Sequence, residues 1–230
     1  MNWRIERNFV VSKFSVDNAV SLYLSDFGKK YIDRIELDIL MRDKQTIPQT
    51  GETISSTIKR ISPDVKINSI LEIGCGIGHN LKILENKYPN ASFTGIDIQK
   101  YAIERGKKLY PKFNFICESA DDFLEKPNKF DLIFTRMFLI HIHPKKIENI
   151  IKKIALRSNY LASIEYFSNF YKEIIWRGNP GAVWKTDFCK LVSKTIPKSI
   201  VLFEEKKEIS KLHYKQKNLA NQNFVIKFTI

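Results

Sequence analysis

The stretch Leu71-Glu-Ile-Gly-Cys-Gly-Ile-Gly-His79 decides the fold of this chain. It gathers three of the nine glycines of the sequence within five residues. An apolar run, Ser69–Gly74, leads into it and has the length of a buried strand, and the amphipathic run His79–Tyr88 after it is typical of a helix. A glycine-rich turn between a strand and a helix lets the backbone approach a ligand closely, and the helix start offers N–H groups to an anion. The segment therefore predicts a ligand-binding loop in an α/β fold.

From residue 68 onward, short apolar runs alternate with amphipathic ones. The expected strands are Ser69–Gly74, Ser92–Asp97, Phe113–Cys117, Phe130–Thr135, Tyr160–Tyr166, Ser199–Ile209 and Asn223–Ile230. The expected helices are His79–Tyr88, Gln99–Tyr110, Lys145–Leu156 and Asp187–Ile196. This alternation predicts right-handed βαβ units and a doubly wound, mainly parallel sheet of seven strands. The last two strands leave little room for a helix between them, so we expect them to pair antiparallel at the edge.

Residues 1–67 have a different texture. Their apolar residues follow helical spacing over Lys29–Met41, and a second helix is expected over Thr53–Ile61, between the break at Pro48–Gly51 and the stop at Pro63. We therefore expect a helical N-terminal extension over residues 1–67 that forms a lid, and one structural unit over residues 68–230.

Composition excludes several classes of protein. Hydrophobic residues make up 43% of the 230 residues and charged residues 27%, which is typical of a soluble globular protein. Three cysteines, an odd number, argue against a disulfide framework and favour a reducing compartment. No apolar run reaches the roughly 18 residues of a transmembrane helix, and residues 1–14 lack the apolar stretch of a signal peptide. We therefore expect a cytoplasmic protein without a membrane span.

The net charge of +13 is spread diffusely. Residues 145–157 carry five basic side chains and one Glu, and residues 190–217 carry eight Lys and three Glu. Neither block interleaves aromatic residues with Arg as a groove for single-stranded nucleic acid does. Nucleic-acid binding is therefore the less favoured interpretation, and it stays open.

The spacing of the glycines excludes two common classes of ligand-binding loop. A dinucleotide-binding loop, G-x-G-x-x-G, requires a glycine where His79 stands, and the Gly-Lys-Ser/Thr of a Walker loop is absent. The pattern G-x-G-x-G preceded by Glu72 resembles motif I of the class I methyltransferases that use S-adenosylmethionine. The resemblance implies a Rossmann-like sheet and a loop that receives the amino-acid end of the cofactor. The residues that it assigns to this end are Glu72, Gly74, Cys75, Gly76 and Gly78.

The resemblance continues through about residue 166. Asp97 ends the second strand, where an acid accepts hydrogen bonds from the ribose hydroxyls. The end of the third strand matches the place where this family reads adenine, although Asp121 is equally well interpreted as a helix N-cap. The further residues that the resemblance assigns to the cofactor are Ile98, Ser119, Ala120, Asp121 and Arg136.

The acceptor is less clearly marked. The fourth strand is not followed by the Asp/Asn-Pro-Pro-Tyr/Phe of enzymes that methylate amino groups of bases, and no cysteine follows a proline, as in pyrimidine-carbon methylation. Residues 26–34, 138–144, 165–168, 176–178 and 184–188 resemble the methyltransferases associated with pseudaminic acid biosynthesis. That resemblance implies a sugar, nucleotide-sugar or similar small polar acceptor in a bacterial surface-glycan pathway. An RNA or protein methyltransferase, or a catalytically idle cofactor-binding protein, stays open.

The connection 167–186 between a strand and a helix is long, and long connections in compact domains are often functional. Its aromatic and basic side chains suit a sugar that carries a carboxylate or phosphate, because Arg binds such anions in a bidentate manner. They are equally well interpreted as core aromatics and solvated cations. The expected acceptor-binding residues are Tyr166, Tyr171, Trp176, Arg177 and Lys185.

A hydroxyl or ammonium acceptor must lose a proton, and we expect the base to be His141, His143 or Glu165. A histidine bonded to the backbone is an equally good interpretation of either imidazole. The two histidines lack a third ligand at matching spacing, so no metal site is predicted. Tyr31 and Arg34, three residues apart on one helical face, are expected to meet the cofactor carboxylate when the lid closes; simple packing on the sheet edge is the alternative.

Overall fold

The computed structural model describes residues 17–42, 54–208 and 220–229. Residues 1–16, 43–53, 209–219 and 230 lie outside the described residues. Parts of the expected N-terminal extension, the outer ends of the last two expected strands and part of the lysine-rich block 190–217 therefore fall there.

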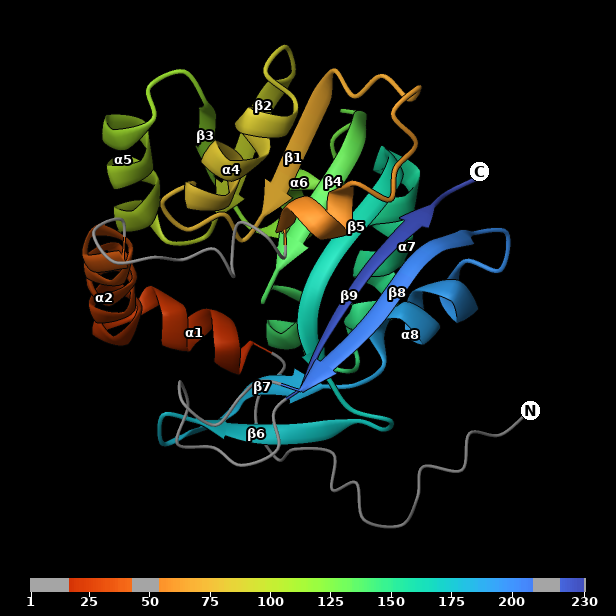
Figure 1. The fold of residues 1–230 in the computed structure, drawn as a ribbon. Coiled ribbons are helices and arrows are strands. Elements are labelled where there is room, and N and C mark those ends of the chain that lie inside the picture. The colour runs from red at the N-terminus through yellow and green to blue at the C-terminus, as the bar shows by residue number, and fades with distance from the viewer. Residues whose placement is uncertain (1–16, 43–53, 209–219, 230) are drawn as a thin grey trace.

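Seven strands form one sheet in the order β3-β2-β1-β4-β5-β9-β8 (Figure 1). They are β1 (Ser69–Ile73), β2 (Ser92–Asp97), β3 (Asn114–Cys117), β4 (Phe130–Arg136), β5 (Ser158–Phe167), β8 (Ile200–Glu208) and β9 (Ala220–Lys227). The strands β1 to β5 are parallel, and β9 runs antiparallel to both β5 and β8. The expected doubly wound sheet with an antiparallel pair at its edge is confirmed. The strand order reverses between β1 and β4, where open α/β sheets bind ligands.

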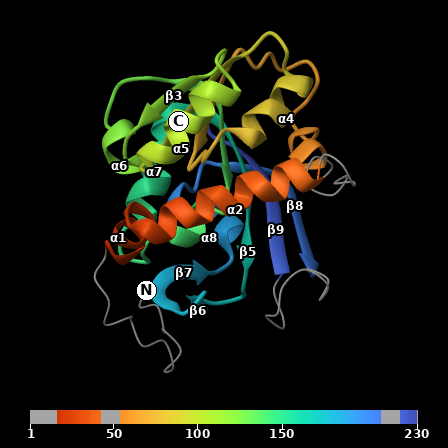
Figure 2. The same cartoon turned by 90° about the vertical axis from the view of Figure 1, so that its left-hand side faces the viewer.

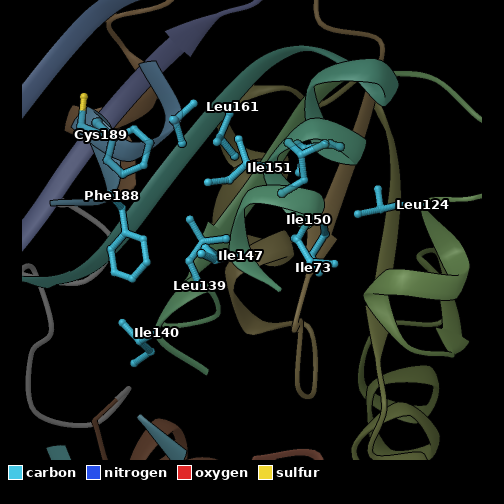
Figure 3. Packing of buried hydrophobic residues seen from close by; sticks show 14 of the residues in the cluster. Ile73, Leu124, Leu139, Ile140, Ile147, Ile150, Ile151, Leu161, Phe188 and Cys189 are labelled. Atoms are coloured by element: carbon cyan, nitrogen blue, oxygen red, sulfur yellow. The ribbon is translucent and has the colours of Figure 1, made fainter. Parts of the chain in front are cut away.

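Helices cover both faces of this sheet. They are α4 (His79–Lys87), α5 (Lys100–Leu109), α6 (Ala120–Phe123), α7 (Ile147–Arg157) and α8 (Phe188–Thr195), with the short 3-10 turn η1 (Leu139–His141) after β4. Successive strand residues point to opposite faces, so Ile133 packs in one core cluster while Leu132 and Phe134 pack in the other. Figure 3 shows Ile147, Ile150 and Ile151 of α7, with Ile151 beside Leu161 of β5 and Ile150 beside Ile73 of β1. The alternating pattern of the sequence thus builds two buried layers.

The N-terminal part contributes α1 (Asn18–Leu24) and α2 (Asp26–Arg42). Both lie at the sheet edge toward which β1 points, and α2 crosses the front of the molecule in the turned view (Figures 1 and 2). The sequence predicted α2 from Lys29 onward but missed α1, which has only seven residues and no side-chain cap. Residues 54–58 are helical, within the expected second helix.

The expected irregular connection 167–186 is instead largely a hairpin of β6 (Lys172–Trp176) and β7 (Asn179–Lys185). Arg177 and Gly178 form its two-residue turn with φ angles of 49° and 83°. Positive φ at both positions is the geometry of a type I′ turn, which matches the twist of the flanking strands. The sequence concealed it because Arg-Gly is not the usual Asn-Gly signal for this turn. The hairpin lies below α1 in Figure 1.

Candidate cofactor and acceptor site

A cavity of about 1050 Å³ lies at the carboxyl ends of β1, β2 and β4 and is lined on one side by α1 and α2. The expected site residues that line it are Tyr31, Arg34, Gly74, Cys75, Gly76, Asp97, Ile98, Ser119, Ala120, Asp121, Arg136, His141, His143, Tyr166, Trp176 and Arg177. The expected site residues that do not line it are Glu72, Gly78, Glu165, Tyr171 and Lys185. One cavity therefore brings together most of the predicted cofactor contacts and part of the predicted acceptor contacts.

The glycine loop takes a conformation that side chains disfavour. The φ angles of Gly74, Gly76 and Gly78 are 71°, 54° and 84°. A Cβ on Gly78 would lie 2.4 Å from Cζ of Phe115, so the turn into α4 also has no room for a side chain at this position. Beside Gly76, in contrast, the only atom of the described residues within 4 Å of such a Cβ is Cδ1 of Ile32 at 4.0 Å. The middle of the loop thus presents bare backbone to the cavity.

Asp97 ties the end of β2 to this loop. Its Oδ2 accepts the N–H of Gly76 at 2.9 Å, and its Oδ1 accepts the N–H of Gln99 at 2.8 Å. Burial raises the pKa of this carboxyl, and the backbone N–H donors oppose the rise. A carboxylate has about four acceptor positions, so the backbone N–H groups leave room for a hydroxyl group in the cavity.

The end of β3 supplies the opposite wall. Oγ of Ser119 accepts the N–H of Asp122 at 3.1 Å and caps α6. The carboxylate of Asp121 pairs with Lys153 of α7, whose ammonium also donates to the Asp121 carbonyl at 3.2 Å. The N-cap of α6 is therefore Ser119, and the interpretation of Asp121 as that N-cap is wrong, because Asp121 lies in the first turn of the helix.

Behind the loop, Glu72 is fully buried and accepts a hydrogen bond from the side-chain amide of Asn80 at 2.6 Å. Arg136 donates to the amide oxygen of Asn80 at 3.4 Å. Burial raises the pKa of Glu72 to about 8, although Asn80 and Arg136 oppose the rise. Glu72 thus acts on the cavity through Asn80, a lining residue that the sequence analysis missed, although a polar residue in the first turn after such a loop was a usable signal.

The two histidines after β4 are both bonded to the backbone. Nδ1 of His141 lies 2.9 Å from the carbonyl of Ala182, and Nε2 lies 3.2 Å from the hydroxyl of Tyr23. Burial lowers the pKa of His141 to about 4. Nδ1 of His143 accepts the N–H of Lys145 at 3.1 Å, and burial together with the nearby lysines lowers the pKa of His143. His141 thus pairs with a further cavity residue, and His143 stabilises the turn before α7.

Glu165 at the end of β5 is fully buried and supports the same turn. Its carboxylate accepts the N–H groups of Phe138 at 3.3 Å and Ile140 at 3.4 Å, and the hydroxyl of Thr135 at 3.1 Å. Burial raises its pKa to about 7, and these donors oppose the rise. The contacts place Glu165 as a residue that positions the η1 turn.

At the hairpin end, Trp176 is buried and Arg177 is exposed, with its guanidinium 5.5 Å from the indole ring. The buried indole N–H of Trp176 lies close enough to the hydroxyl of Tyr23 to lower the pKa of that tyrosine. Tyr171 instead packs against the main core cluster, and Lys185 lies at the far end of β7. The tip of the hairpin therefore reaches the cavity, and its other end does not.

The segment that carries the loop and β1 to β4 has known relatives. Residues 70–157 match the methyltransferase domain family. A malonyl-[acyl-carrier protein] O-methyltransferase of Anoxybacillus flavithermus is 48% identical over 69 residues, which are 29% of this chain and 26% of that protein. The uncharacterized protein RP789 of Rickettsia prowazekii is 30% identical over 128 residues, 54% of this chain and 23% of that protein. The chain spans about a quarter of the length of these curated relatives.

Solved structures share the whole fold. The plantazolicin methyltransferase BpumL, crystallised with S-adenosylhomocysteine (SAH), superposes with a TM-score of 0.62 at 17% identity, covering 93% of this chain and 96% of that one. An S-adenosylmethionine-dependent methyltransferase of Clostridium acetobutylicum gives a TM-score of 0.59 at 11% identity, covering 88% and 100%. The expected Rossmann-like methyltransferase fold is therefore confirmed.

No helix within the described ranges has the length and apolar character needed to cross a bilayer. Across the same residues, His, Cys, Asp and Glu side chains form no group of three or more that could hold a metal ion.

Proposed function

We propose that this chain is an S-adenosylmethionine-dependent methyltransferase whose acceptor is a small polar molecule, a sugar or nucleotide sugar of a bacterial surface-glycan pathway. The observation that carries the proposal is the hydrogen bond between Asp97 and the N–H of Gly76 at the wall of the cavity. It joins a bare glycine turn and a carboxylate, the two features that an adenosyl group bearing an amino acid requires.

The residues present fit this cofactor. One buried oxygen, Oε2 of Glu72, has no hydrogen-bond partner among the residues that the structure describes, and its neighbours Asn80 and Arg136 face the cavity. The loop with Asn80 and Arg136 would hold the amino-acid end, and Asp97 would hold the ribose. Ile98 and Ala120 would pack on the adenine, and Tyr31 and Arg34 of α2 would cover the opening. When bound, the cofactor supplies a methyl group already activated on a sulfonium.

The chain's own contribution is alignment and exclusion of water. The helices α1 and α2 line the cavity opposite the sheet, so they would shield an acceptor inside it from solvent on that side. Proper alignment of two reactants contributes about 7–11 kcal/mol to a displacement. The acceptor enters beside Tyr166, Trp176 and Arg177, where aromatic faces and a cation suit a sugar ring that carries an anionic group.

Transfer of a labelled methyl group tests the proposal. The full chain is incubated with methyl-labelled S-adenosylmethionine and, in separate reactions, UDP-N-acetylglucosamine, UDP-glucuronate, malonyl-acyl carrier protein and bacterial RNA. We expect label in a nucleotide sugar, and loss of transfer in Gly76→Val, whose side chain would project from the bare loop. Gly178→Val, at a φ of 83° with no atom of the described residues within 4 Å of its Cβ, is the control for backbone strain. It is compared with Gly76→Val by SAH affinity, because its turn also carries Arg177.

Label found only in the carrier protein or only in RNA would show that the acceptor is not a sugar, and it would leave the proposed methyltransferase activity in place. Uptake of SAH without transfer to any of the four acceptors would favour a catalytically idle cofactor-binding protein.

A further inference from the structure

We propose that Tyr23 is a catalytic residue that passes the proton of a hydroxyl or amine acceptor to His141. The proposal rests on the proposed methyltransferase function and deepens it, because it restricts this route to acceptors that must lose a proton. Tyr23 belongs to α1, 118 positions away from His141 in the sequence, and both residues line the cavity.

The hydrogen bonds of His141 define its tautomer. The carbonyl of Ala182 can only accept, so Nδ1 at 2.9 Å from it carries the proton. In the neutral ring Nε2 is then the acceptor, and the group that faces it, at 3.2 Å, is the hydroxyl of Tyr23. A proton that is transferred to Nε2 of His141 therefore passes through the hydroxyl of Tyr23.

The other two candidate bases are otherwise engaged. Nδ1 of His143 already accepts the N–H of Lys145, so its other nitrogen carries the proton of the neutral ring. Glu165 is fully buried, does not line the cavity and accepts hydrogen bonds from the turn after β4. Of the three, His141 is the one whose accepting atom faces another cavity residue.

Contacts that do not involve its hydroxyl hold Tyr23 in place. The side-chain amide of Gln99 donates to the Tyr23 carbonyl at 2.6 Å, and the Gln99 backbone N–H binds Asp97. A Cβ on Gly28 would lie 1.8 Å from the same carbonyl oxygen, so the bend from α1 into α2 depends on that glycine. The Tyr23 ring packs edge-on against Tyr31 with centroids 5.6 Å apart. The fold thus places the hydroxyl relative to the glycine loop.

The proposed step moves two protons. The O–H bond of the acceptor breaks as Tyr23 takes its proton, and the former proton of Tyr23 forms a bond with Nε2 of His141. The acceptor oxygen gains the methyl carbon as the C–S bond of the sulfonium breaks and its electron pair stays on sulfur. The positive charge lost by the sulfonium ends on the His141 imidazolium, which then releases its proton to solvent.

The surroundings favour transfer in one concerted step. Burial, with the nearby ionisable groups of Tyr31, Tyr166 and Asp97, raises the pKa of Tyr23 far above its ordinary value, while the indole of Trp176 opposes the rise. Burial lowers the pKa of His141 to about 4. Neither a tyrosinate nor an imidazolium accumulates, so Tyr23 gives up a proton only as it receives another.

Kinetics with two kinds of acceptor test the relay. Wild type, Tyr23→Phe, His141→Gln and the double variant are assayed with UDP-N-acetylglucosamine, a hydroxyl acceptor, and with malonyl-acyl carrier protein, a carboxylate acceptor. The control is Tyr101→Phe, because the Tyr101 hydroxyl also makes a hydrogen bond, to Oδ1 of Asp33 at 2.6 Å, but Tyr101 does not line the cavity.

With the hydroxyl acceptor, we expect each single variant to lower kcat about 100-fold or more, with KM nearly unchanged. The double variant falls no further, because the two residues serve one transfer. With the carboxylate acceptor, kcat stays within about threefold of wild type, since no proton has to leave. SAH affinity and Tm stay close to those of Tyr101→Phe.

Equal losses for both acceptors, an additive double variant, or a Tyr23→Phe rate like that of Tyr101→Phe would overturn the relay and leave a structural contact. Transfer to the carboxylate probe alone, or SAH uptake without transfer to either probe, overturns it as well. Failure of the wild-type chain to take up SAH counts instead against the proposed function.

Discussion

Replacement of Gly78 by alanine separates two reasons for a glycine in the loop. Its φ of 84° costs an L-residue about 1–2 kcal/mol in any surroundings. The added Cβ would also lie 2.4 Å from Cζ of Phe115, a core residue that is 3% exposed, and such overpacking costs about 1–3 kcal/mol. We therefore expect Gly78→Ala to lower the free energy of unfolding by about 2–5 kcal/mol.

Gly178→Ala is the matched control. Its φ of 83° is nearly the same, but no atom of the residues that the structure describes lies within 4 Å of the new Cβ. Only the backbone cost of about 1–2 kcal/mol therefore applies. Urea unfolding of both variants and wild type, followed by circular dichroism, gives the two differences. Equal destabilisation by the two substitutions would refute the close approach of the loop to Phe115.

Three further predictions concern the site. Burial raises the pKa of Glu165 from an ordinary 4.5 to about 7, so Glu165 stabilises the fold most below pH 4.5 and loses this contribution as the pH rises to 7. The free energy of unfolding of wild type relative to Glu165→Gln should therefore fall by about 3 kcal/mol over that range. A difference that does not change with pH in urea titrations would contradict the burial of this carboxyl. Arg177→Ala should raise KM for UDP-glucuronate about tenfold and leave SAH affinity unchanged, because the guanidinium at the hairpin tip would bind the acceptor anion. An equal loss of SAH affinity would argue against a role of Arg177 in acceptor binding. Asn80→Ala leaves the buried Glu72 without its donor and should lower thermal stability by about 1–3 kcal/mol, which calorimetry measures, with the exposed Asn90→Ala as control.

The parts of the fold that local patterns encode were predictable. The strand from Ser69 follows from a short continuous apolar run, and the helix from His79 follows from an apolar period of 3.6. The glycines between them mark the turn. Asp97 was predictable for the same reason, because the carboxyl ends of parallel strands meet at one edge. The aspartate and the loop are indeed joined by a hydrogen bond.

The contacts that cross the cavity were not predictable. Tyr23 meets His141 only because α1 folds over the sheet edge, and no local pattern encodes a pair so far apart in the sequence. Tyr171 and Lys185 looked like acceptor ligands by composition, but the hairpin turns only its tip, Trp176 and Arg177, toward the cavity. Residue type indicated the chemistry in these cases, and the tertiary fold decided the position.

Calorimetric titration of the full chain with SAH tests most directly whether the glycine loop and Asp97 form the cofactor pocket. We expect one site in wild type and the same affinity in Asp64→Ala, which removes an exposed carboxylate that accepts a hydrogen bond from the hydroxyl of Ser62. In Asp97→Ala the affinity should fall at least about tenfold, because the lost carboxylate would bind ribose hydroxyls. Absence of binding in wild type, or equal binding by Asp97→Ala, would contradict a cofactor pocket formed by the glycine loop and Asp97.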